Sequence, residues 1–285
     1  MGTLVAAVAM THNPRIFWNA DAATEEDRAA VGGAFAAARA ALQAAAPDLV
    51  IAVANDHLHR FGLDNLPAFG VGTAAEVAGP YWYEREVMRL PGYQGAGHPD
   101  LAEDILWGLS ESGIGPSRCG AFRVDHAFTV PLSVVLPDAD VPVVPVFVNT
   151  FVPPLPGSAR CFDMGRALRQ VIADRPGGER VAVVASFNLS VEVGGPGMGR
   201  RHADFDDRVL GWIADGDIGR LVGELTPERL VGYGNSTAEF LNYHAVLGVV
   251  GERAPDLVRY HQADAWGGCP VVVWRAATKP SQPVN

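Results

Sequence analysis

Hydrophobic and polar positions follow two patterns along this chain. Short runs rich in β-branched residues contain almost no polar position, which is typical of strands buried on both faces. Longer segments carry apolar residues at helical spacing and end at Gly or Pro. The runs cover residues 4–10, 49–55, 141–148, 181–186 and 270–275, and the helical segments cover 25–47, 98–113, 161–178 and 237–251.

Strands that alternate with helices predict an α/β protein with a mixed central sheet flanked by helices. The chain has 285 residues, a length that allows one large domain or two small ones. No linker, repeat or low-complexity segment divides it. We therefore expect a single catalytic domain over residues 1–275, and a flexible tail over the polar, proline-bearing residues 276–285.

Charge and composition restrict the partners. The formal net charge is −10 and no block of Lys or Arg occurs, which argues against binding to nucleic acid or to an anionic membrane. No apolar run reaches the roughly 18 residues of a membrane span. The three cysteines are widely spaced and odd in number, so they predict neither a disulfide framework nor a metal site. We expect a cytoplasmic protein.

Polar clusters stand at the ends of the predicted strands, where α/β sheets gather function. His12 follows the first strand, His57 and His59 follow the second, and His126 precedes another apolar run. Glu239 lies at the start of the helical segment 237–251. Two imidazoles and one carboxylate that leave coordination positions open suit a mononuclear non-haem Fe(II) site. Spacing alone leaves the alternative that any one of these histidines is an ordinary core or surface residue.

Other catalytic motifs are missing from the sequence. No GxGxxG follows a strand, and neither a GxxxxGK[ST] phosphate loop nor a GxSxG nucleophile elbow occurs. Ser186 and Ser190 are explained more simply as turn hydroxyls than as nucleophiles, because no paired base marks them.

A set of short motifs resembles the class III extradiol ring-cleavage dioxygenases. In order, they are "THNP", "NDHLHRF", "VDHAFTVPL", "PVVPVFVNTFVPPLPG", "VASFNLSVEVGGPG" and "GNSTAEF". The resemblance covers most of residues 4–250. It implies Fe(II)-dependent cleavage of a catecholic or aminophenolic ring by O2, with a small aromatic diol as substrate and a homo-oligomer as the assembly.

The resemblance also implies roles for single residues. His12, His57 and Glu239 would be the iron ligands, and the family pattern selects His57 rather than His59. His126 would be the histidine that hydrogen-bonds the substrate or the bound oxygen. Two further residues are candidates for substrate binding: His59 and Asn188.

Position 191 departs from the family pattern. The family's strand-end loop reads like "SGGLSH" and ends in an acid/base histidine, whereas this chain has Val191 there. If the chain descends from a ring-cleaving enzyme, three explanations of Val191 stay open. In the first, the proton is moved by His126 or by a neighbour such as Glu192, His202 or water. In the second, the chain has diverged to other metal chemistry, and in the third, the residue was engineered. A fourth alternative, a non-catalytic subunit, does not explain three retained ligands.

The substrate also stays open among catechol, protocatechuate-like, arylpropionate-like and aminophenol rings. Arg15, Arg85 and Arg123 are candidates to bind a substrate carboxylate, and the sequence does not choose among them. The aromatic-rich segment 79–95 is a candidate to cover the pocket or to form an oligomer contact.

Overall fold

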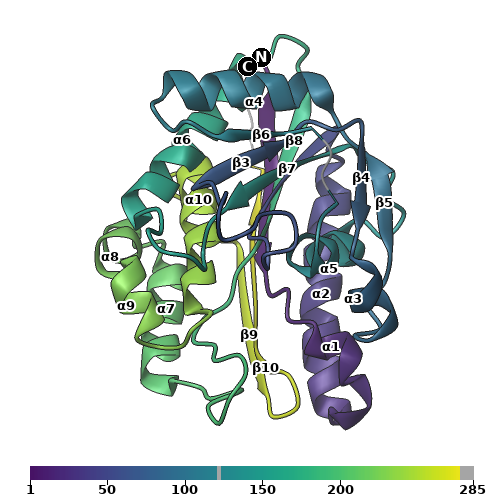
Figure 1. Cartoon of the computed structure of the whole chain (residues 1–285), viewed down its shortest axis with the longest axis vertical. Coiled ribbons are helices and arrows are strands. Elements are labelled where there is room, and N and C mark those ends of the chain that lie inside the picture. The colour runs from purple at the N-terminus through teal and green to yellow at the C-terminus, as the bar shows by residue number, and fades with distance from the viewer. Residues whose placement is uncertain (121–122, 277–285) are drawn as a thin grey trace, which may run out of the picture.

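One mixed sheet of eight strands forms the centre of the computed structural model, which describes residues 1–120 and 123–276 (Figure 1). The strand order is β6-β3-β7-β2-β8-β1-β10-β9. β7, β2, β8 and β1 run parallel, β3 is antiparallel to β7, and β10 is antiparallel to both β1 and β9. The strands are β1 (Thr3–Met10), β2 (Leu49–Ala54), β3 (Phe69–Gly72), β6 (Ser117–Cys119), β7 (Val143–Val148), β8 (Arg180–Ser186), β9 (Leu257–Ala263) and β10 (Gly267–Arg275).

Helices cover both faces of this sheet (Figure 1). One layer contains α4 (Pro99–Glu111), α6 (Ser158–Asp174), α7 (Ala203–Asp215), α8 (Ile218–Glu224), α9 (Pro227–Val231), the 3-10 turn η2 (Thr237–Phe240) and α10 (Leu241–Val250). The other contains α1 (Arg15–Trp18), the 3-10 turn η1 (Ala20–Ala22), α2 (Glu25–Ala45), α3 (Trp82–Glu86) and α5 (His126–Val135), beside a small antiparallel sheet of β4 (Glu76–Gly79) and β5 (Tyr93–Ala96). Among the described residues, no helix has the length and apolar character needed to cross a membrane.

The central strands bury both of their faces, which explains their uninterrupted apolar sequence. Side chains alternate from one face of a strand to the other. Ile51 and Val53 of β2 pack in the same core as Met164 of α6, whereas Val50 packs in the opposite core with Ala38 of α2. The prediction of a mixed sheet flanked by helices is confirmed.

Two glycines let α6 and α10 approach closely within the first of these layers. A Cβ on Gly165 would overlap the carbonyl oxygen of Ala245, and a Cβ on Gly248 would overlap the carbonyl oxygen of Phe162. The backbones therefore touch where the helices cross. This contact holds α10 and the η2 turn before it in a fixed position beside the sheet.

All five predicted strands and all four predicted helical segments are present, with ends shifted by a few residues. His261 lies in β9, where its Nε2 is 2.7 Å from an oxygen of Asp27. Apart from Ala276, the predicted tail over 276–285 lies outside the described residues.

Candidate metal centre and cavity

The polar residues meet at the carboxyl edge of the parallel strands. His12 lies two residues after β1, His57 three residues after β2, and Asn188 two residues after β8. All three line a cavity of about 340 Å³. Parallel strands end at the same edge of a sheet, so residues far apart in sequence converge there.

Glu239 stands between two imidazoles. Its Oε2 lies 3.5 Å from Nε2 of His12, and its Oε1 lies 3.3 Å from Nε2 of His57. Glu239 and His12 are each 2% exposed, and the His57 side chain is 23% exposed toward the cavity. The η2 turn delivers the carboxylate just before α10 begins. The structure therefore brings together the three residues that the family resemblance selects.

The donor set fits a metal ion. Buried His12 has no hydrogen-bond partner for Nδ1 among the described residues, and its Nε2 has only the long contact to Glu239. Neutral imidazole and carboxylate are the usual ligands of divalent iron, zinc and related ions. An ion between the three side chains would give Nε2 of His12 a close partner in place of the long contact to Glu239.

His126 lies beside this set without belonging to it. The ligand atoms of His12, His57 and His126 all lie within 4.8 Å of one another. However, the rings of His57 and His126 are stacked, with centroids 4.0 Å apart and planes 18° from parallel. The lone pair of each ring nitrogen lies in the plane of its ring, and one ion cannot lie in both of two stacked planes, so the two rings cannot both bind it at the roughly 2 Å of a metal–nitrogen bond.

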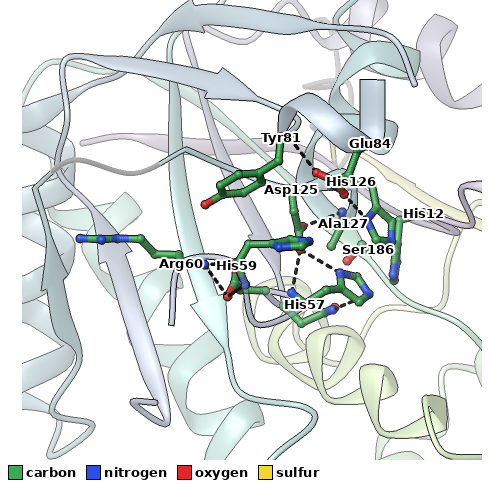
Figure 2. A network of polar contacts seen from close by, with 12 residues as sticks. His12, His57, His59, Arg60, Tyr81, Glu84, Asp125, His126, Ala127 and Ser186 are labelled. Carbon is green, nitrogen blue, oxygen red and sulfur yellow. Dashed lines mark hydrogen bonds and ion pairs between the residues drawn. The ribbon is translucent and has the colours of Figure 1, made fainter. Parts of the chain in front are cut away.

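Asp125 fixes the orientation and tautomer of His57. Its Oδ2 accepts hydrogen bonds from the backbone N–H of His57 at 2.7 Å and from Nδ1 of the same residue at 2.8 Å, as Figure 2 shows. Its Oδ1 accepts from the N–H of Ala127 and so caps α5. Because Asp125 holds the proton of Nδ1, Nε2 is the nitrogen that faces Glu239 and would become the metal ligand once it gives up its own proton.

Glu84 performs the equivalent task for His126. This fully buried carboxylate comes from α3, and its Oε1 accepts from the backbone N–H of His126 at 3.1 Å and from Nδ1 at 2.6 Å (Figure 2). Its Oε2 accepts from the N–H of Tyr81. Both oxygens act as acceptors, so Nδ1 of His126 carries a proton and Nε2 is left free.

The metal-free site is strongly polarised. Burial alone would lower the pKa of His57, but Asp125 and Glu239 raise this pKa to about 10. Burial would raise the pKa of Glu239, but His12 and His57 hold it far below its usual range. Burial and the charge of His57 lower the pKa of His126 to about 4, so its imidazole is neutral near pH 7.

Asn188 contacts Glu239 directly. It donates from Nδ2 to Glu239 Oε2 at 2.6 Å, and its Oδ1 accepts from the hydroxyl of Thr11 at 2.9 Å. These two bonds fix which atoms of the amide face the carboxylate. Asn188 also lines the cavity, so it is placed to orient Glu239 and to touch a ligand.

The loop with the atypical residue forms one wall of the cavity. Val191 lines it, and the backbone of Val191 is held by the Thr237 hydroxyl, which accepts from its N–H at 3.1 Å. Glu192 also lines the cavity, whereas His202 is not among the lining residues and lies 5.5 Å, ring to ring, from Tyr233. Val191 therefore adds an apolar residue to the cavity wall.

The remaining residues proposed from the sequence differ in whether they line the cavity. His59 does not line the cavity; its Nε2 lies 2.7 Å from the hydroxyl of Tyr83, which does. Of the three arginines considered for a carboxylate, Arg15 lines the cavity, and Arg85 and Arg123 do not.

Sequence reasoning missed Glu84, Tyr83 and the role of Thr11. Glu84 and Tyr83 lie within the aromatic-rich segment 79–95, whose composition marked it as a possible pocket cover. Nothing local in that segment shows that Glu84 reaches the first residue of α5.

The fold and the site define an α/β protein with a candidate mononuclear metal centre of two histidines and one carboxylate. The chain belongs to the family described as the catalytic LigB subunit of aromatic ring-opening dioxygenase, whose model matches residues 6–268. The resemblance to class III extradiol dioxygenases is confirmed.

Individual relatives agree with this assignment. The chain is similar to the 2,3-dihydroxyphenylpropionate/2,3-dihydroxicinnamic acid 1,2-dioxygenases of Escherichia coli strain K12 and of E. coli O157:H7 strain EC4115, with 31% identity over 202 residues in each case. The matched part is 70% of this chain but only 61% of each relative. An uncharacterized protein, JW3007, from E. coli K12 shares the fold, with a TM-score of 0.58 over 95% of this chain and 99% of that one, at 18% identity.

Proposed function

We propose that this protein is a non-haem Fe(II)-dependent extradiol dioxygenase that opens a catecholic or aminophenolic ring with O2. The observation that carries the proposal is the convergence of His12, His57 and Glu239 on the cavity of a chain of this family. The relatives' names support an aromatic diol as the class of substrate. Residues 1–275 would form the catalytic domain, and a homo-oligomeric assembly and a cytoplasmic location stay predictions.

Bound iron would supply a Lewis acid and a template that joins the ring and O2. His12, His57 and Glu239 would hold it, and Asn188 would keep the carboxylate in position. Phe151, whose ring centroid is 5.1 Å from that of His57, and Val191 offer apolar surface to the face of an aromatic ring. The cavity would thus bind the ring and limit the access of water.

His126 is our candidate to move the proton. Its Nδ1 is held by Glu84, which leaves Nε2 to accept a proton from a substrate hydroxyl and to return it later. Val191 has no atom that could do this. A well-placed general acid/base contributes about 10²–10⁴-fold. We therefore expect His126→Ala to lower kcat by that factor and to leave the iron content unchanged.

The test is to load the protein with Fe(II) without oxygen, to add a panel of diols and aminophenols, and then to admit O2. We expect oxygen uptake together with a yellow ring-opened product. His12→Ala should lose stoichiometric iron. Absence of oxygen uptake with every compound would refute ring cleavage. If the protein binds iron but takes up no oxygen, the chain belongs to the alternative, a metal-binding relative that has lost ring cleavage.

Val191→His provides a second test of the proton route. The substitution adds an imidazole to the cavity wall where the family has one. If it raises kcat by more than about 100-fold, the size of one acid/base group, His126 does not carry the proton transfer in the natural chain. An increase below that limit supports the route through His126.

A further inference from the structure

Two segments distant in sequence contact each other beside the cavity. The N–H of Val191 donates to the hydroxyl of Thr237 at 3.1 Å, and the carbonyl oxygen of Val191 accepts from the N–H of Ser236 at 3.3 Å. A Cβ on Gly234 would lie 2.1 Å from that same carbonyl oxygen, so the two backbones touch. The loop that leads to α7 therefore lies directly against the entry to η2, the turn that carries Glu239.

Asn235 joins these two segments through three hydrogen bonds. Its Oδ1 accepts from the N–H of Val193 at 2.9 Å, and its Nδ2 donates to the carbonyl oxygen of Val193 at 2.8 Å. Its own N–H donates to Oε2 of Glu192 at 3.1 Å. The two side-chain bonds imitate the way in which a neighbouring antiparallel strand would pair with Val193. Because Asn235 is exposed, packing of the core does not require an asparagine at this position.

The two ends of this loop, residues 191–201, are held together next to Asp206. This fully buried carboxylate of α7 accepts from the N–H and from the hydroxyl of Ser190, each at 2.9 Å. The Ser190 hydroxyl in turn accepts from the N–H of His202 at 3.0 Å, which joins the residues on either side of the loop. The base of the loop is therefore fixed by a buried carboxylate and does not depend on Asn235.

The middle of the loop is held less firmly than its base. In the part of the chain that the structure describes, the hydrogen bonds between residues 191–199 and the rest of the protein all go to residues 235–237. Three glycines of the loop have φ between 66° and 79°, in the left-handed region that favours glycine: Gly194, Gly195 and Gly199. A segment with so few tertiary hydrogen bonds opens more easily than the core. The contact with Asn235 therefore decides how firmly this part of the cavity wall is held.

We propose that Asn235 is a positioning residue that couples the loop 191–201 to the metal centre. Glu239 lies four residues after Asn235, and Asn188, just before the loop, holds its Oε2. A metal ion bound by Glu239 would fix the turn and, through Asn235, the loop. Such coupling is reciprocal, so a loop released from Asn235 must also weaken metal binding. The metal rests on the proposed function, whereas the link between turn and loop rests on the hydrogen bonds.

The test follows amide hydrogen exchange of the full chain by mass spectrometry, with and without Fe(II), in the absence of oxygen. In wild type, Fe(II) should slow exchange in residues 191–199 by about 2–10-fold, the net effect of one hydrogen bond. Asn235→Ala should speed exchange there in the metal-free protein, remove most of the slowing by Fe(II), and weaken Fe(II) binding in competition with a chelator. A merely structural role of Asn235 would instead speed exchange equally with and without Fe(II), and would leave the Fe(II) affinity unchanged.

Asn65→Ala is the matched control, because Asn65 is also exposed and its Oδ1 accepts from the N–H of Gly62 at 2.9 Å, in a loop that does not line this cavity. It should leave both the slowing by Fe(II) and the Fe(II) affinity as in wild type.

Exchange in residues 191–199 that ignores Fe(II) in wild type would overturn the proposal, and so would an Asn235→Ala variant that keeps both the slowing and the affinity. If the loop responds to Fe(II) but the protein consumes no O2, ring cleavage fails and the coupling stands. If O2 is consumed and the loop does not respond, the coupling fails and the proposed function stands. A protein that takes up no Fe(II) would refute both.

Discussion

Asp125 offers the sharpest test of how the site is built, because one carboxylate serves both the candidate ligand His57 and the α5 helix. Oδ2 accepts two N–H groups of His57, and Oδ1 accepts the N–H of Ala127. In Asp125→Asn, an NH2 group must replace one of these acceptors and then faces a donor. We expect the free energy of unfolding of the metal-free protein to fall by about 1–3 kcal/mol, the penalty of an unsatisfied buried group.

The same substitution should weaken metal binding. Without the charge of the carboxylate, Nδ1 of His57 no longer has to carry the proton. The imidazole can then move this proton to Nε2, the nitrogen that faces Glu239. Loss of such an orienting partner typically costs about 10–100-fold in metal affinity. Urea unfolding without metal gives the stability, and anaerobic competition for Fe(II) against a chelator gives the affinity.

Asp56 provides the control from the same loop. It is also buried, but the hydrogen bonds that its oxygens accept within residues 1–120 and 123–276 all come from backbone N–H groups, those of residues 59, 60 and 61. Asp56→Asn should therefore cost a comparable free energy of unfolding and leave Fe(II) affinity unchanged. If Asp125→Asn kept wild-type affinity, or if both variants lost it equally, the tautomer argument would be refuted.

Further consequences concern pH, positioning and packing. Burial alone would lower the pKa of His57, but the neighbouring carboxylates raise it to about 10, so metal binding must release a proton. Chelator competition from pH 6.5 to 8.5 should therefore show the Fe(II) affinity rising about tenfold per pH unit. An affinity that does not change with pH would contradict this. Glu84→Gln should lower kcat more than it changes KM, because a neutral amide accepts more weakly than the carboxylate from Nδ1 of His126, and steady-state kinetics check this with iron content as control. Gly165→Ala should destabilise the fold by at least about 1–3 kcal/mol in urea unfolding, because its Cβ would overlap α10. Gly33→Ala, in an open part of α2, should instead stabilise by up to about 1 kcal/mol; equal effects would refute the packing argument.

The central strands could be predicted because burial on both faces leaves a clear mark on composition. The shorter outer elements could not. β3, β5 and β6 have only three or four residues each, and glycine or exposed polar residues interrupt their apolar pattern. Such strands are decided by the neighbour they pair with, as β3 is by β7. Their register is a property of the sheet and not of their own sequence.

The candidate site could also be predicted only in part from the sequence. His12 and His57 directly follow buried strands, and the geometry of parallel strands sends both to one edge of the sheet. Glu239 was selected through the family resemblance, since its local sequence says little. The contacts that prepare these groups join residues distant in sequence, such as Glu84 with His126 and Asp125 with His57.

The sequence by itself determined the class of fold, the family and the identity of the polar residues at the strand ends. It also determined that position 191 has no titratable group. Only the tertiary structure decided which nitrogen of each imidazole is free, which arginine faces the cavity, and which carboxylates already have partners. The physical reason is that hydrophobic periodicity is written locally, whereas hydrogen bonds and ion pairs depend on which distant segments the packed core brings within about 3 Å.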